Sequence, residues 1–119
     1  MVPTAARMTI EWFVPAGQAR PITMALHSLM DETRIAHGCV GCSVSMGLGE
    51  QGTVRYVEEW ETEDDLRRRV RCTSFMQLVA LMDVAIQAPH VEFALPNGRR
   101  GLDFAEEVRG SISSNNSEV

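Results

Sequence analysis

Residues 39–60, CVGCSVSMGLGEQGTVRYVEEW, decide the fold, because they contain two alternating segments separated by a short turn. From Cys39 to Met46 every second residue is apolar, and a period of two returns from Thr53 to Trp60. Such a period, with β-branched and aromatic residues, is typical of strands. The loop between them is short, so the two segments are expected to form an antiparallel hairpin.

Helical periods flank this hairpin on both sides. Residues 18–36 repeat apolar side chains at steps of three and four, with Pro21 in the first turn and Gly38 as the C-terminal stop. After the hairpin, Thr62 caps an acidic first turn, and LRRRVR ends that helix with the cations its dipole favours. The buried side of a further helix carries Phe75, Leu78, Val79, Met82 and Ile86.

Alternation predicts outer strands at Arg7–Val14 and Pro89–Leu95, and residues 101–108 are expected to form a short fifth strand or an arm. The order β-α-β-β-α-β, with a split second helix, is the ferredoxin-like α+β arrangement with an antiparallel sheet. Helices cover one face of such a sheet, and several of these strands carry apolar residues on both faces. The open face is therefore expected to pair with that of a second copy, which gives a homodimer.

The 119 residues are expected to form one domain, residues 7–109. Residues 1–6 are predicted to be a flexible leader, with Met8 as an alternative start, and the polar residues 110–119 a disordered tail. The net charge of −5 argues against non-specific nucleic-acid binding. No apolar run is long enough to span a membrane or to form a signal peptide, so a cytoplasmic location is expected.

Cys39 and Cys42 form a CxxC motif, which can be a redox dithiol or half of a zinc site. A redox pair needs its first cysteine at a helix N-terminus, whereas Cys39 is expected to follow a helix and begin a strand. Residues three apart in a strand lie about 10 Å apart and point to opposite faces, which excludes a disulfide. Cys72 and scattered histidines do not complete a zinc site. We predict free thiols and no metal.

With these elements in order, residues 7–109 resemble the antibiotic biosynthesis monooxygenase (ABM) family of small dimeric α+β barrel proteins. The resemblance is carried by HGCVGCSV at 37–44, VEEW at 57–60 followed by acidic residues and Leu66, CTSF at 72–75 and GLDFAEEVR at 101–109. It implies a homodimer joined through its sheet faces, with an apolar pocket between sheet and helices in each subunit. Some members oxidise polycyclic phenols or quinols with dioxygen and without metal or flavin, others degrade haem, and many have no known activity.

The resemblance implies a cofactor-independent monooxygenase acting on a small aromatic or quinol substrate. An electron-rich phenolate can pass an electron to dioxygen itself, so the protein need only bind the substrate, remove its proton and stabilise the charge. The alternative is a non-catalytic small-molecule-binding or accessory protein of the same fold. Haem degradation is disfavoured, because the first strand lacks the Asn and FMQLVALMD at 75–83 lacks the His that those members use.

The candidate catalytic residues are Trp60, Glu58, Tyr56 and Arg69. Trp60 stands where the family places a Trp, and the spacing of two puts it on one strand face with Tyr56 and Glu58. Glu58 either enters the pocket or is neutralised by an Arg, and the two aromatic residues are alternatively plain core residues.

Arg69 replaces the His of the family pattern Leu-x-x-His. An Arg cannot act as a base at neutral pH, but it can hold a phenolate or superoxide by charge. The alternative is that Arg69 belongs to a solvated cationic helix end with Arg67, Arg68 and Arg71, paired with Glu61, Glu63, Asp64 and Asp65.

A second set is expected to bind the aromatic substrate: Trp12, Phe75, Leu78, Met82 and His90. His90 shares its strand face with Glu92 and is the one candidate imidazole base, at the pocket or at the dimer interface. His27 is expected to face solvent. His37 ends a helix, where a cation meets the negative end of the dipole, and that structural role is sufficient for it.

Overall fold

The computed structural model describes residues 4–47, 51–83, 85 and 87–117. The elements follow in the order β1 (Ala6–Pro15), α1 (Ala16–Arg34), β2 (Cys39–Gly47), β3 (Gln51–Trp60), α2 (Glu63–Arg71), α3 (Thr73–Asp83), β4 (His90–Leu95), β5 (Gly98–Arg100) and α4 (Leu102–Ser117). The predicted ferredoxin-like α+β fold, with its split second helix, is confirmed. Among the described residues, no helix has the length and apolar content needed to cross a bilayer.

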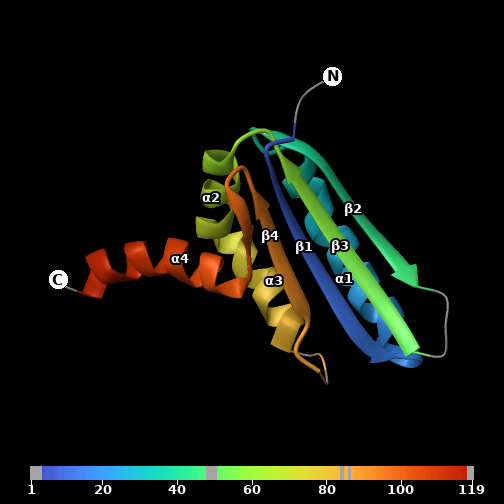
Figure 1. The fold of residues 1–119 in the computed structure, drawn as a ribbon. Coiled ribbons are helices and arrows are strands. Elements are labelled where there is room, and N and C mark those ends of the chain that lie inside the picture. Colours follow the sequence, from blue (N-terminus) through green and yellow to red (C-terminus); the bar gives the residue numbers. More distant parts are fainter. Residues whose placement is uncertain (1–3, 48–50, 84, 86, 118–119) are drawn as a thin grey trace.

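The strands form one antiparallel sheet in the order β2-β3-β1-β4-β5. The central pair is β1 and β3, which run side by side from Ala6 opposite Trp60 to Pro15 opposite Gln51. Figure 1 shows α1, α2 and α3 together on one side of this sheet. The core lies between these two layers, because alternate residues of β1 are buried on the side of the helices: Ala6, Met8, Ile10, Trp12 and Val14.

The other face of the sheet is more polar than the sequence pattern indicated. Arg7 lies opposite Glu59, and Glu11 lies opposite Arg55, so opposite charges meet across β1 and β3. Apolar surface on this face is limited, and Phe13 is 37% exposed. The alternating sequence pattern predicted a more apolar face. It did not show that charged residues of β1 and β3 lie opposite one another on this face.

The N-terminal strand begins earlier than expected. Ala6 opens β1, the backbone N–H of Ala5 donates to the Trp60 carbonyl at 3.1 Å, and the Thr4 hydroxyl donates to Glu59 at 3.1 Å. The first bond continues the β1–β3 ladder into the segment expected to be a leader, and the second adds a side-chain contact. The first three residues of that segment lie outside the described residues.

The C-terminal segment forms a helix where a strand or arm was expected. Phe104, Ala105 and Val108 are buried at helical spacing, and the Phe104 ring centroid lies 4.9 Å from that of Phe93 on β4. Arg109 Nη1 donates to the Val70 carbonyl of α2 at 2.7 Å. α4 extends away from the sheet and continues to Ser117, into the segment 110–119 for which the composition predicts disorder (Figure 1).

Candidate functional site

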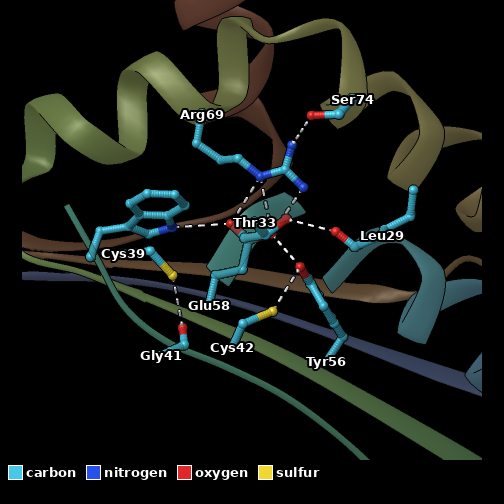
Figure 2. Close-up of polar contacts among 10 residues, drawn as sticks. Leu29, Thr33, Cys39, Gly41, Cys42, Tyr56, Glu58, Arg69 and Ser74 are labelled. Atoms are coloured by element: carbon cyan, nitrogen blue, oxygen red, sulfur yellow. Dashed lines mark hydrogen bonds and ion pairs between the residues drawn. The ribbon is translucent and has the colours of Figure 1, made fainter. Parts of the chain in front are cut away.

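A buried carboxylate, Glu58 on β3, is the centre of a polar network on the helix-covered face (Figure 2). Arg69 Nε lies 3.2 Å from Glu58 Oε1 and 3.1 Å from Oε2, and Arg69 Nη2 donates to Oε2 at 3.0 Å. Trp60 Nε1 donates to Oε1 at 3.0 Å, and the Tyr56 hydroxyl donates to Oε2. The predicted catalytic residues are therefore in direct contact, and the alternative in which an Arg neutralises Glu58 is the one observed.

Local sequence explains how this network is assembled. A spacing of two places Tyr56, Glu58 and Trp60 on one face of β3. On α2, Arg69 follows Leu66 by three residues, and the side chains of both are buried. Arg69 therefore belongs to the buried side of that helix. Arg69 Nη1 also donates to the hydroxyl of Ser74 on α3 at 2.9 Å, which links the sheet to both helices.

The neighbouring arginines behave differently from Arg69. Arg67 pairs with Glu63 at 2.7 Å and Arg68 with Asp65 at 2.9 Å, along α2 itself. Burial alone would lower the pKa of Arg69, but the charge and hydrogen bonds of Glu58 outweigh burial and raise it. Arg69 is thus a permanent cation inside the protein, and its side chain is only 4% exposed.

Tyr56 and Cys42 extend the network without supplying a base, and Cys39 lies near it. The Cys42 thiol donates to the Tyr56 oxygen at 3.2 Å. Burial raises the pKa of Tyr56, and the charge of Glu58 raises it further. Burial also raises the pKa of Cys42 to about 11 and, together with Glu58, raises that of Cys39. All these groups stay protonated at neutral pH.

The two cysteines lie on the same sheet face, so the expectation that they point to opposite faces is wrong. Cys39 lies opposite Trp60 and Cys42 opposite Glu58, and the register shifts between Cys39 and Gly41. This bulge adds one residue to β2, which changes the parity of the positions that follow it. Both cysteines are free; the Cys39 thiol donates to the Gly41 carbonyl of β2, and the Cys42 thiol points to Tyr56 (Figure 2).

A cleft of about 200 Å³ borders this network at the end of β3. Its walls come from the C-terminal end of α1, the turn that follows, α2 and the start of α3. The lining residues are Glu32, Thr33, Ala36, His37, Trp60, Asp65, Arg68, Arg69, Cys72 and Ser74. Two predicted catalytic residues, Trp60 and Arg69, thus reach a cavity, whereas Glu58 and Tyr56 lie in the protein interior beside them.

The predicted substrate-binding residues lie elsewhere. Trp12 is fully buried, and its Nε1 donates to the Leu81 carbonyl at 3.1 Å. His90 is exposed on the open sheet face opposite Glu11, away from the cleft, and its expected place at a dimer interface stays a prediction. The remaining three are buried core residues of α3 that do not line the cleft: Phe75, Leu78 and Met82.

Several cleft residues were not predicted as site residues, above all His37 and Asp65. The hydroxyl of Thr62 and the guanidinium of Arg68 lower the pKa of Asp65. The turn at Gly38 could have indicated both residues. That inference, however, needs the knowledge that α2 packs against this turn, which the sequence does not show. Within the described part of the chain, no three His, Cys, Asp or Glu side chains lie close enough together to hold a metal ion.

The sequence matches no family model and no curated protein. Solved structures do match. The crystal structure of an antibiotic biosynthesis monooxygenase superposes on this chain with a TM-score of 0.62 and 18% sequence identity. The match covers 74% of this chain and 94% of that protein. The chain has the ABM fold.

Two further solved structures share the ABM fold with this chain. A conserved protein from Methanosarcina mazei Go1 has a TM-score of 0.67 and 20% identity, over 77% of this chain and 92% of that protein. A Deinococcus radiodurans protein, described as a candidate antibiotic biosynthesis monooxygenase, has a TM-score of 0.65 and 16% identity. This match covers 74% of this chain and 88% of that protein. At these identities the similarity establishes the ABM fold, and activity has to be argued from the site.

Proposed function

We propose that the protein is a cofactor-independent monooxygenase that oxidises a small phenol or hydroquinone with dioxygen. The observation that supports this most is the cleft of about 200 Å³ beside the Trp60 indole, in a chain with the ABM fold. Ligand pockets usually measure about 300–1,000 Å³, so this volume favours a substrate of one or two rings.

The proposed reaction converts a hydroquinone and dioxygen into a hydroxyquinone and water. The substrate loses the protons of its two hydroxyl groups and exchanges one ring hydrogen for a hydroxyl group. One oxygen atom enters the ring and the other leaves as water. Dioxygen is the oxidant, and the ionised substrate supplies the electrons. The protein has to bind the ring, accept the first proton and stabilise negative charge.

The four predicted catalytic residues divide into two roles under this proposal. Trp60 contacts the aromatic substrate, and Arg69 contributes positive charge at the cleft wall. Glu58 and Tyr56 hold these two side chains in place, because Glu58 accepts hydrogen bonds from Trp60, Arg69 and Tyr56. They are positioning residues, since Glu58 is 0% exposed.

Oxygen uptake by the metal-stripped protein with a panel of naphthohydroquinones tests the proposal. We expect uptake above the autoxidation of at least one substrate, and a loss of rate in Trp60→Phe, which keeps an aromatic ring but lacks the indole N–H. The matched control is His27→Gln, an exposed position on α1 outside the cleft. Uptake that never exceeds autoxidation would reject the oxygenase.

One observation favours the alternative, a non-catalytic small-molecule-binding protein. Arg69, at the position of the family His, directs Nε and Nη2 to Glu58 and Nη1 to Ser74. Neither Arg69 nor the enclosed Glu58 can then act as a base. Calorimetric titration with a naphthol under nitrogen, beside the aerobic uptake assay, separates the two functions. Saturable binding under nitrogen together with no oxygen uptake in air supports the binding protein.

We also propose that the protein is a homodimer joined through its open sheet faces, where Phe13 is the exposed aromatic residue. Light scattering should then give twice the chain mass of 13.2 kDa. Phe13→Glu should lower that mass, whereas Met24→Glu, on the outer side of α1, should not. A wild-type mass of one chain would reject the dimer. A cytoplasmic location remains a prediction.

A further inference from the structure

The cleft needs a proton acceptor that the predicted catalytic residues do not provide. Glu58 is enclosed, Tyr56 holds its own proton, and Arg69 cannot accept one. The other titratable or charged side chains that line the cleft are Glu32, His37, Asp65, Arg68 and Cys72.

The turn after α1 fixes His37 at the rim of the cleft. The N–H of Cys39 donates to the Ala36 carbonyl at 3.1 Å, which closes a four-residue turn with His37 and Gly38 at its centre. Gly38 has φ +85°, which the third position of a type II turn requires. A Cβ at Gly38 would overlap the carboxyl group of Asp65, and the Gly38 carbonyl accepts from the Glu61 N–H at 2.8 Å. The turn is therefore packed directly against α2.

Chemistry distinguishes His37 from its neighbours. Asp65 accepts hydrogen bonds from Thr62 at 2.8 Å and from Arg68 at 2.9 Å, and these partners lower its pKa, so it is a poor acceptor for a phenol proton. Imidazole is the side chain that takes up and releases protons near neutral pH. His37 is exposed, and a proton taken up there can pass on to water.

We propose that His37 is the catalytic base of the cleft, and this inference rests on the proposed function. In the step, the O–H bond of the phenol breaks and an N–H bond forms on the imidazole, leaving a phenolate and an imidazolium. No electron moves in this step. Arg68 faces the resulting anion: among the described residues only its Nη1 has a partner, Asp65, and its side chain is 56% exposed.

Charged side chains of both signs line the cleft around His37. Glu32 on α1 and Asp65 on α2 are anionic, whereas Arg68 and Arg69 on α2 are cationic and can stabilise a phenolate. The cleft can therefore hold both products of the proton transfer. A cleft of one sign would stabilise one product at the expense of the other.

Binding of 4-nitrophenol, whose anion absorbs visible light, tests the proton transfer without any oxidation. In the wild type we expect the bound probe to ionise at lower pH than the free probe. His37→Gln should reduce this shift to the part that Arg68 and Arg69 provide, and His27→Gln should preserve it in full. Imidazole NMR of the wild type should show the His37 signal, and not those of His27 and His90, changing on addition of the probe. The NMR measurement uses only the wild type, so it tests the proposal even if His37→Gln folds poorly.

Oxygen uptake separates this inference from the proposed function. We expect His37→Gln to lower kcat about 100-fold at neutral pH, with little change in KM and with the pH dependence lost. If oxygen uptake by His37→Gln equals that of His27→Gln at every pH, the role of His37 is overturned and the proposed oxygenase function stands. A His37-dependent probe shift without any oxygen uptake would reject the oxygenase and keep the proton acceptor. Failure of the probe to bind, together with no uptake, would reject both.

Discussion

Arg69 of α2 and Glu58 of β3 form a buried ion pair at the wall of the cleft. Their side chains are 4% and 0% exposed, and Arg69 Nη2 lies 3.0 Å from Glu58 Oε2. Trp60 and Tyr56 donate to the same carboxylate, so both of its oxygens are satisfied. Among the described residues, no buried side-chain nitrogen or oxygen lacks a hydrogen-bond partner. Such a pair stabilises little relative to apolar residues, but it is costly to break on one side only.

Arg69→Met should destabilise the protein by about 3–5 kcal/mol, because it leaves the Glu58 carboxylate buried without a cation. Glu58→Gln with Arg69→Met should recover part of that loss, since the double variant buries no charge. Urea unfolding of the wild type, both single variants and the double variant measures this coupling. Additive effects of the two substitutions would show that the pair is not coupled.

Tyr56→Phe should destabilise by about 1–3 kcal/mol. The change removes one donor to Glu58 and the acceptor of the Cys42 thiol, and leaves the ring in place. Thr23→Val, which removes an α1 hydroxyl bonded only within its own helix, is the matched control and should cost less. The free energies of unfolding of the two variants decide the comparison, and equal losses would contradict the assigned role of Tyr56.

Gly38→Ala should be strongly destabilising, by about 1–3 kcal/mol from the positive φ alone. The added methyl group would also meet the Asp65 carboxyl group, so we expect the cleft to distort as well. Gly17→Ala is the control, because a Cβ there meets nothing within 4 Å and the residue lies in α1. That change should be neutral or slightly stabilising. Similar midpoints of thermal unfolding for both variants would contradict the packing of the turn.

Stability should fall at alkaline pH, partly through Cys42. Burial raises its pKa to about 11, whereas an unfolded cysteine ionises at about 8.5. The folded protein therefore holds this proton more tightly. The resulting stabilisation is complete below about pH 8.5 and is lost as the pH rises towards about 11. Urea midpoints across this range should fall less in Cys42→Ser, whose hydroxyl does not ionise there, and parallel curves would rule out the contribution.

The sequence determined the fold well, because the alternation in β1 to β4 and the helical periods of α1 to α3 each bury one side of their element. It missed features that depend on a single residue or on packing between elements. The bulge after Cys39 reversed the face of the first cysteine, and no local pattern announces such an extra residue. α4 was mistaken for a strand or an arm, because Phe104, Ala105 and Val108 show their helical spacing only once β4 and α2 provide the surface.

The site was predictable where strand parity alone decides it, as for Tyr56, Glu58 and Trp60. The spacing of three from Leu66 indicates that Arg69 turns inward, but only packing shows that it pairs with Glu58. His37 was assigned a structural role because the sequence shows that it lies at the end of a helix. The sequence does not show that α2 packs against that end and forms a cleft there.

The walls of the cleft differ in how freely they can change. Trp60, Arg69 and Ser74 are all tied to the Glu58 carboxylate, directly or through the guanidinium, so a substitution on that side disturbs stability and shape together. On the α1 side, Glu32 and Ala36 line the same cleft and take no part in that network. A library of variants aimed at new ligands should therefore change residues of α1, because these substitutions alter the shape of the cleft and leave the Glu58 network intact.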